Sequence, residues 1–299
     1  MPESVLNKFS PVVAGTMSYG KGGKNLTEGE VADLIKHTVS NKITTFDMAD
    51  IYGDYTTEAL FGKGFRKSGV FRESVQFVTK CGIKAPQPTR PEYKVKHYDT
   101  SRDHITWSVE NSLKNLHTDY LDLLLIHRPD PLMDPRELAE VFQKLKDDGK
   151  VLHFGVSNFT PTQFEMMDAQ FPLVTDQVES KSEHAQAVFE HGTLDLCVEK
   201  NIRPMAWSPL GQGLLTGKSA ASGLLREMAT QHQATPAQVL IAWLLKHPSG
   251  ILPVMGTTRP ERLRKHGLRS RLSLRARSGL HCGKPLKEKK FPKQRALSL

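Results

Sequence analysis

Short apolar segments recur along the chain with amphipathic stretches between them, and this alternation constrains the fold more than any other feature. Segments rich in β-branched and large apolar residues predict eight strands, at residues 12–17, 43–48, 75–80, 121–127, 152–158, 174–178, 202–208 and 251–254. Parallel strands of one sheet are joined by crossovers of about a dozen residues or more, usually a helix. The sequence therefore predicts an α/β fold, a (β/α)8 TIM barrel, in a chain of 299 residues.

Helix start signals lie between the expected strands. Thr27 with Glu30 has the spacing of a capping box, and Ser101 precedes an apolar stripe at helical spacing. Asp134 and Thr160 are each followed by proline, the residue that suits the first position of a helix. We expect a helix to begin at each of these sites.

An open, doubly wound sheet is the alternative arrangement for alternating strands and helices. It is less favoured because no G-x-G-x-x-G follows the first expected strand. The lysine- and glycine-rich segment 20–24 lacks the strand, spacing and hydroxyl residue of a phosphate loop. We interpret this segment as a solvated turn.

The net charge of +9 is concentrated at one end of the chain. Residues 259–299 hold 14 of the 41 lysines and arginines but only two of the 32 acids, so they carry +12 and the remaining residues −3. The tail has few apolar residues and many like charges, which favours disorder. We expect a barrel at residues 1–258 and a basic tail at 259–299 that is poorly ordered or aberrant. Only this tail could bind nucleic acid, which is an unlikely partner.

Location and metal binding are constrained by what the sequence lacks. No apolar run approaches the roughly 18 residues of a membrane span, and the first ten residues show no apolar signal segment. The three cysteines are isolated and in no C-x-x-C arrangement, so we expect thiols. We expect a cytoplasmic protein with no membrane partner and no metal.

Four residues able to carry catalysis stand at or just after the ends of three consecutive expected strands. Asp47 ends the second strand with Tyr52 close behind it, Lys80 ends the third, and His127 ends the fourth. The carboxyl ends of barrel strands converge on one face, where active sites of this fold lie. We therefore expect an acid, a phenol, an amine and an imidazole to meet there.

This group suits the reduction of a carbonyl. Hydride attack leaves an alkoxide that must receive a proton, and Tyr52 could give it if the Lys80 ammonium lowers the phenol pKa from about 10. Asp47 would neutralise the ammonium, and His127 would donate to the substrate oxygen. The hydride must come from a cofactor.

Six segments in order resemble signatures of the aldo-keto reductases: DMADIYG at 47–53, FVTKCG at 77–82, LLLIHRPD at 123–130, GVSNF at 155–159, DQVE at 176–179 and AWSPL at 206–210. The resemblance runs from about residue 9 to 262 and is nearest to bacterial-type members with ADIYG and LIHRPDPLMD. It implies an NADP-dependent oxidoreductase acting on small-molecule aldehydes or ketones, with Tyr52 as proton donor and Asp47, Lys80 and His127 as its partners.

The resemblance also implies where NADPH binds. The nicotinamide carboxamide would be held by Ser157, Asn158 and Gln177, with Trp207 stacked on the ring. The pyrophosphate would be wrapped by the turn that holds Ser208, Pro209, Leu210 and Gly213, and the 2′-phosphate would meet Gly256, Thr257 and Arg262.

The chain departs from the family pattern after Arg262. Members of the family normally show a glutamate and an asparagine that contact the adenine, then a closing helix and a loop over the substrate. Lys265 and His266 stand at those two positions here, and the helix and loop are not recognisable. A replaced terminus of this kind predicts weaker NADPH binding and lower barrel stability.

Each candidate residue also has an ordinary interpretation. Asp47 could cap a turn, Tyr52 and His127 could be rim or core residues, and Lys80 could be a solvated lysine. Trp207 could belong to the core, and Ser157 with Asn158 could form a turn. The joint occurrence of the first four at successive strand ends favours the catalytic interpretation.

Other functions remain open at this point. Lys80 could form a Schiff base, as in class I aldolases. The chain could instead be a catalytically weak cofactor-binding or regulatory subunit, since some relatives of the aldo-keto reductases serve as regulatory subunits of potassium channels. The substrate is not specified by the sequence, although segments 18–24, 84–100 and 128–133 are expected to shape its pocket.

Overall fold

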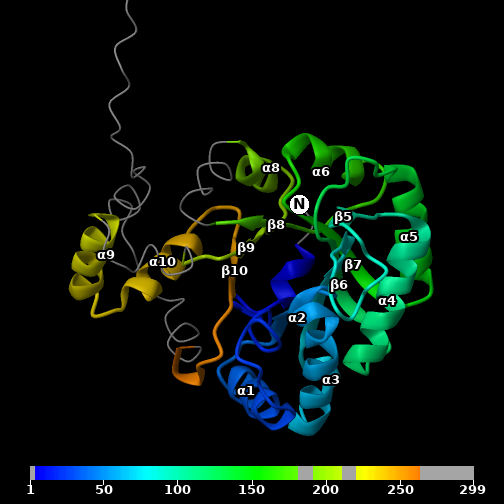
Figure 1. Ribbon diagram of the computed structural model, residues 1–299. Helices are drawn as coiled ribbons and strands as arrows, with labels where there is room; N and C mark the ends of the chain where they lie inside the picture. Colours follow the sequence, from blue (N-terminus) through cyan, green and yellow to red (C-terminus); the bar gives the residue numbers. More distant parts are fainter. Residues whose placement is uncertain (1–3, 181–190, 211–219, 263–299) are drawn as a thin grey trace, which may run out of the picture.

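The computed structural model describes residues 4–180, 191–210 and 220–262. Eight parallel strands close a barrel in the order β1-β10-β9-β8-β7-β6-β3-β2, with helices around it (Figure 1). The strands are β1 Val13–Gly15, β2 Thr45–Asp47, β3 Gln76–Cys81, β6 Leu121–Ile126, β7 Val151–Ser157, β8 Asp176–Glu179, β9 Met205–Trp207 and β10 Leu252–Met255. The predicted TIM barrel is confirmed.

Helices occupy the intervals between the strands. Their bounds are α1 Glu28–Ser40, α2 Tyr52–Tyr55, α3 Thr57–Ser68, α4 Arg102–Leu116, α5 Pro135–Asp147, α6 Pro161–Asp168, α8 Thr193–Glu199, α9 Ala220–Gln231 and α10 Pro236–Leu244, with short 3-10 turns η1 Val5–Lys8 and η2 Arg72–Ser74. The predicted caps are confirmed: the side chains of Thr27, Ser101, Asp134 and Thr160 each accept a backbone N–H of the following turn. Thr235, which the sequence analysis did not single out, caps α10 in the same way.

The core has two layers. Inside the barrel, buried side chains of alternate strand positions pack together and are joined by Leu6 and Phe9, which lie in and just after η1. Outside it, the opposite faces of the strands pack against the helices, with Phe46, Phe61 and Phe77 among the largest fully buried side chains. Burial on both faces explains why the strands read as continuous apolar runs.

A small antiparallel hairpin leaves the barrel after β3. It pairs β4 Ile83–Lys84 with β5 His97–Tyr98 and belongs to the connection between β3 and α4. It therefore stands at the end of the barrel where the strands finish. The segment 20–24 was interpreted from the sequence as a solvated turn; residues 21–24 form exposed turns after β1, whereas Gly20 is buried.

Several expectations fall outside the described residues, namely Gly213 and the tail beyond Arg262, including Lys265 and His266. In the part of the chain that is described, no helix is long and apolar enough to cross a membrane. Cys81 and Cys197 are free and buried.

Candidate active site

The four residues expected to carry catalysis meet at one end of the barrel. Asp47 is the last residue of β2, Lys80 lies near the end of β3, and His127 directly follows β6. Tyr52 begins α2, a single irregular turn in which Gly53 and the residue after it have positive φ angles. The strand order places β2, β3 and β6 side by side, so their carboxyl ends bring these side chains together.

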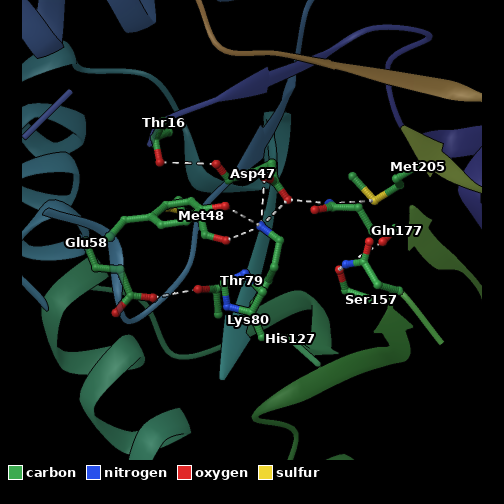
Figure 2. Close-up of polar contacts among 12 residues, drawn as sticks. Thr16, Asp47, Met48, Glu58, Thr79, Lys80, His127, Ser157, Gln177 and Met205 are labelled. Carbon is green, nitrogen blue, oxygen red and sulfur yellow. Dashed lines mark hydrogen bonds and ion pairs between the residues drawn. The ribbon is translucent and has the colours of Figure 1, made fainter. Parts of the chain in front are cut away.

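Lys80 is the centre of the site (Figure 2). Its Nζ donates to both carboxylate oxygens of Asp47 at 2.8 Å and to the carbonyl oxygen of Met48 at 2.7 Å. It also lies 3.3 Å from the Tyr52 hydroxyl. The side chains of Lys80 and Asp47 are fully buried, at 1% and 3% exposure.

The charge on Lys80 is stabilised by its neighbours. Burial alone would lower the pKa of the ammonium, but the Asp47 carboxylate and the Tyr52 hydroxyl outweigh it and raise the pKa above its usual value. Asp47 gains a further donor, because the Gln177 side-chain amide donates to its Oδ1 at 2.7 Å. The buried ion pair is therefore hydrogen-bonded on several sides, which a charged pair in the interior needs.

Tyr52 differs from the sequence expectation in its acidity. Its side chain is partly exposed, but its hydroxyl lies against the buried ammonium. Burial raises the pKa of the phenol, and the lowering effect of Lys80 offsets only part of this because Asp47 acts in the opposite sense. The net decrease in the Tyr52 pKa that was expected from the sequence is therefore wrong for the protein without cofactor. The phenol keeps its proton at neutral pH.

His127 faces Tyr52 with ring centroids 6.0 Å apart at 80°. Burial lowers the pKa of its imidazole well below the usual value, and the charges of Lys80, Arg128 and Lys96 lower it further. The ring is therefore neutral at physiological pH and carries one N–H. Its Nδ1 is buried and has no hydrogen-bond partner in the described chain.

The residues expected to hold the nicotinamide lie at the ends of the next strands. The hydroxyl of Ser157, at the end of β7, donates to the Gln177 backbone carbonyl at 2.8 Å and accepts the Asn158 side-chain amide at 2.7 Å. The Trp207 indole N–H, at the end of β9, donates to the Asn158 side-chain oxygen at 3.1 Å. These three side chains and the Gln177 backbone form one hydrogen-bonded group, and the Gln177 side chain links it to the ion pair.

The remaining expected cofactor residues lie further around the opening. Ser208, with a positive φ of 53°, and Pro209 and Leu210 follow β9 directly. Gly256 and Thr257 follow β10, and Arg262 is exposed in a helical turn that begins at Pro260. Gly213 lies outside the described residues. The described members thus follow two adjacent strands of the barrel.

Sequence reasoning missed two contributors to the site and included a third, Arg128, only as part of the segment 128–133 expected to shape the pocket. The Met48 carbonyl contacts Lys80, and the Met205 sulfur lies 3.7 Å from the Gln177 amide nitrogen. No sequence signal marks a backbone carbonyl or a core sulfur as a site atom. Arg128 lies next to His127 and places its guanidinium 5.6 Å from the centre of the Trp207 ring; its position directly after a strand-end histidine could have indicated it.

A second buried polar group, also missed, lies behind β3. Glu58 of α3 accepts hydroxyl hydrogen bonds from Thr79 at 2.6 Å and from Ser112 of α4 at 3.1 Å. Asp50 accepts one from Ser108 at 2.8 Å, and burial together with the nearby Glu58 raises the Asp50 pKa to about 8. Glu58 shares a buried helix face with Phe61 and Phe65, and a carboxylate on such a face was the available signal.

Cys81 lies beside this acidic group. Burial raises the pKa of its thiol well above the usual value, and the charges of Asp50 and Glu58 add to this effect. Cys81 is the free thiol that the sequence predicted, and its burial and raised pKa disfavour the reactive thiolate.

The opening of the barrel thus holds an ion pair against a phenol and an imidazole, with side-chain amides and an indole beside them. This combination is typical of a barrel enzyme that transfers protons to or from a small molecule. Comparisons with known proteins identify the class further. The chain matches the Aldo/keto reductase family over residues 11–267 and belongs to that family.

Its relatives carry matching names. The chain is 46% identical over 264 residues to an uncharacterised oxidoreductase, YcsN, of Bacillus subtilis, with 86% of this chain and 87% of the relative covered. It is 41% identical over 261 residues to a 6-dehydroglucose reductase of Agrobacterium fabrum, covering 86% and 87%. The crystal structure of a thermostable aldo-keto reductase, Tm1743, with the inhibitor epalrestat matches with a TM-score of 0.78 at 30% identity, covering 91% of this chain and 94% of that chain. The chain is therefore an oxidoreductase of a carbonyl-reducing family.

Proposed function

We propose that the protein reduces aldehydes and ketones to alcohols with NADPH, and that Tyr52 is the general acid. The observation that supports this most directly is the 3.3 Å contact between the Tyr52 hydroxyl and Lys80 Nζ, with the ammonium held by Asp47. This arrangement keeps a proton on the phenol before reaction and stabilises the phenolate after the proton has left.

Each residue has a separate task in the reaction. Tyr52 transfers its proton to the carbonyl oxygen as that oxygen becomes an alkoxide. Lys80 neutralises the phenolate that results, and Asp47 keeps the ammonium charged and in place. His127, neutral because of its lowered pKa, donates its N–H to the same oxygen and polarises the carbonyl. NADPH, when bound, supplies the hydride.

The side chains present fit a nicotinamide. A carboxamide has both donors and an acceptor, and Ser157, Asn158 and Gln177 offer hydroxyl and amide groups of both kinds in adjacent strands. The Gln177 side-chain oxygen has no hydrogen-bond partner within the described residues, since only its amide nitrogen is engaged. The indole of Trp207 provides a flat apolar surface beside them.

The preference for NADPH over NADH is proposed from the segment after β10. Arg262 is exposed there, and no atom lies within 4 Å of where a Cβ of Gly256 would stand in the described structure. A guanidinium with no ion pair among the described residues, six positions after an open stretch of backbone, suits a phosphate group. The affinity for NADPH compared with NADH tests this part, and Arg262→Met should remove the difference.

The Schiff-base alternative needs an uncharged amine as nucleophile. Lys80 is instead held charged by a buried carboxylate, and its pKa is raised. Borohydride treatment with an aldehyde should therefore leave no adduct on Lys80. The non-catalytic alternative predicts NADPH binding with no oxidation of NADPH by a reactive aldehyde such as 4-nitrobenzaldehyde.

The decisive experiment compares Tyr52→Phe with Tyr120→Phe. Tyr120 precedes β6 at the opposite end of the barrel, so it is a control for loss of a phenol. We expect kcat to fall by about 10²- to 10⁴-fold in Tyr52→Phe only, with NADPH binding, measured by fluorescence, unchanged. Equal kcat in wild type and Tyr52→Phe would remove Tyr52 from the proposed role.

A further inference from the structure

A hollow of about 530 Å³ lies between the segments that follow β3 and β6, the strands at whose ends Lys80 and His127 stand. One wall is the β4–β5 hairpin, with Lys96 and Tyr98, and the other is the segment after β6, with Asp130 and Leu132. The hairpin follows the strand that carries Lys80, and the other wall follows His127. The hollow is therefore on the reacting face of the barrel, where the part of a substrate remote from its carbonyl would lie.

Arg128 lies two residues before Asp130 of this wall, and its guanidinium approaches Trp207 of the proposed nicotinamide surface. One of its nitrogens, Nη1, donates to the His127 backbone carbonyl at 3.0 Å, and the guanidinium carbon lies 5.6 Å from the centre of the Trp207 ring. These contacts hold the side chain over the opening. The other guanidinium nitrogens have no hydrogen-bond acceptor among the residues that the structure describes.

The positive charges at this opening are not balanced by ion pairs. Neither Arg128 nor the exposed Lys96 has a carboxylate within ion-pair distance in the described chain. Both are close enough to His127 for their charges to lower its pKa, after burial and Lys80. They therefore lie near the imidazole.

The nearby carboxylates, Asp130 and Asp176, form no ion pair with either cation among the described residues. Asp130 lines the hollow, but its Oδ1 accepts the Leu132 backbone N–H at 2.9 Å and its Oδ2 accepts the Thr100 hydroxyl at 3.2 Å. Asp176 is fully buried, and burial raises its pKa to about 7. Two cations are thus left with unused donors at the mouth of the site.

We propose that Arg128 and Lys96 recognise an anionic group of the substrate, so that the protein prefers aldehydes or ketones that carry a carboxylate or a similar oxyanion. This rests on the proposed reductase function and adds the substrate class. A guanidinium pairs with a carboxylate through parallel N–H donors, and a charge-assisted pair is about twice as strong as a neutral hydrogen bond.

The experiment uses two aldehydes of the same shape, 4-carboxybenzaldehyde and its neutral methyl ester. The measured quantity is the ratio of kcat/KM for the acid to that for the ester, followed by NADPH oxidation in the wild type, Arg128→Met and Lys96→Met. Lys94→Met is the matched control, because Lys94 lies on the same exposed loop, contacts the Pro91 carbonyl and does not line the hollow.

We expect the wild type to prefer the acid by about tenfold or more, and we expect this ratio to fall about fivefold or more in Arg128→Met and to a smaller extent in Lys96→Met. Lys94→Met should keep the ratio. Raising the salt concentration should also reduce the ratio, because ions screen a partly exposed pair.

Other results would overturn the inference. Turnover of both aldehydes without preference for the acid would refute it and leave the reductase function standing. A preference for the acid that both variants retain would also refute the inference. A decrease in kcat/KM in Arg128→Met that is equal for acid and ester would refute it too, because it would indicate a structural role for Arg128.

Absence of NADPH oxidation with either aldehyde would refute the reductase function instead. Calorimetry with the two corresponding alcohols then decides the anion site without turnover. Tighter binding of 4-(hydroxymethyl)benzoate than of its methyl ester, lost in Arg128→Met, would support the site, and equal or undetectable binding would refute it.

Discussion

The buried Lys80–Asp47 pair should show strong energetic coupling. The two charges are 2.8 Å apart, which corresponds to an attraction of about 6 kcal/mol at an effective dielectric constant of about 20. Removing one partner leaves the other charge buried without its counterion, which costs about 3–5 kcal/mol. Lys80→Met and Asp47→Asn should therefore each reduce the free energy of unfolding by this amount.

The double variant separates this effect from simple loss of contacts. The double variant Asp47→Asn with Lys80→Met has no charge left to desolvate. Its decrease in the free energy of unfolding should therefore be close to that of one single variant, and smaller than the sum of the decreases in the two single variants. The coupling energy from the double-mutant cycle should be about 3 kcal/mol. Urea unfolding followed by circular dichroism provides the four free energies.

An exposed pair offers the control cycle. Lys144 and Asp148 are 3.2 Å apart at one-turn spacing near the end of α5, and the Lys144 side chain is 70% exposed. Their coupling should be several-fold smaller than that of the buried pair, because water and salt screen exposed charges. The electrostatic account of the active site would be refuted if the buried cycle gave a coupling as small as this one.

Two further predictions concern stability away from the chemistry. Burial, with a smaller effect of Lys84, lowers the His104 pKa to about 4. As the pH falls, the imidazole is therefore protonated in the unfolded chain before it is protonated in the folded protein. The free energy of unfolding should decrease as the pH falls from about 6.5 to 4. His104→Gln should flatten this part of the stability curve measured by urea unfolding, and an unchanged slope would contradict the assignment. Gly62→Ala should destabilise the protein by about 1–3 kcal/mol despite the better helix propensity of alanine, because its Cβ would stand 2.1 Å from the Asn115 carbonyl oxygen. Gly223→Ala, in a helix with nothing within 4 Å in the described structure, should instead be neutral or stabilise by up to about 1 kcal/mol, and equal effects of the two changes would refute the packing argument.

The fold could be predicted because its signals are local. Each barrel strand is a short apolar run, and each predicted helix start carries a capping side chain that the structure shows in use. The strand ends were less accurate. The run expected at 202–208 forms a ladder only at Met205–Trp207, because a strand ends where its neighbours in the barrel stop pairing with it.

The proximity of the four catalytic candidates followed from fold geometry, but their electrostatics did not. Parallel barrel strands finish on one face, so Asp47, Lys80 and His127 had to converge there. The sign of the Tyr52 pKa shift depends on how deeply the hydroxyl is buried compared with its distance from the ammonium. A sequence gives neither quantity.

Contacts that join distant parts of the chain were also out of reach. Glu58 and Ser112 meet through the packing of α3 on α4, and nothing near either residue in the sequence names the other. The same holds for the Met48 carbonyl, which acts through its backbone, so its side chain carries no information about the contact.

The strand order divides the opening of the barrel into two arcs. The proton-handling residues stand on β2, β3 and just after β6, whereas the amides and the indole stand on β7, β8 and β9. The 2.7 Å hydrogen bond from Gln177 to Asp47 crosses between these arcs and links residues 130 positions apart (Figure 2). A rotation of this one amide would remove a hydrogen-bond donor from the Asp47 carboxylate, so that Lys80 alone would have to balance more of the carboxylate charge. Gln177 therefore connects the ligand bound at β7, β8 and β9 to the acidity of the proton-handling residues on the other arc.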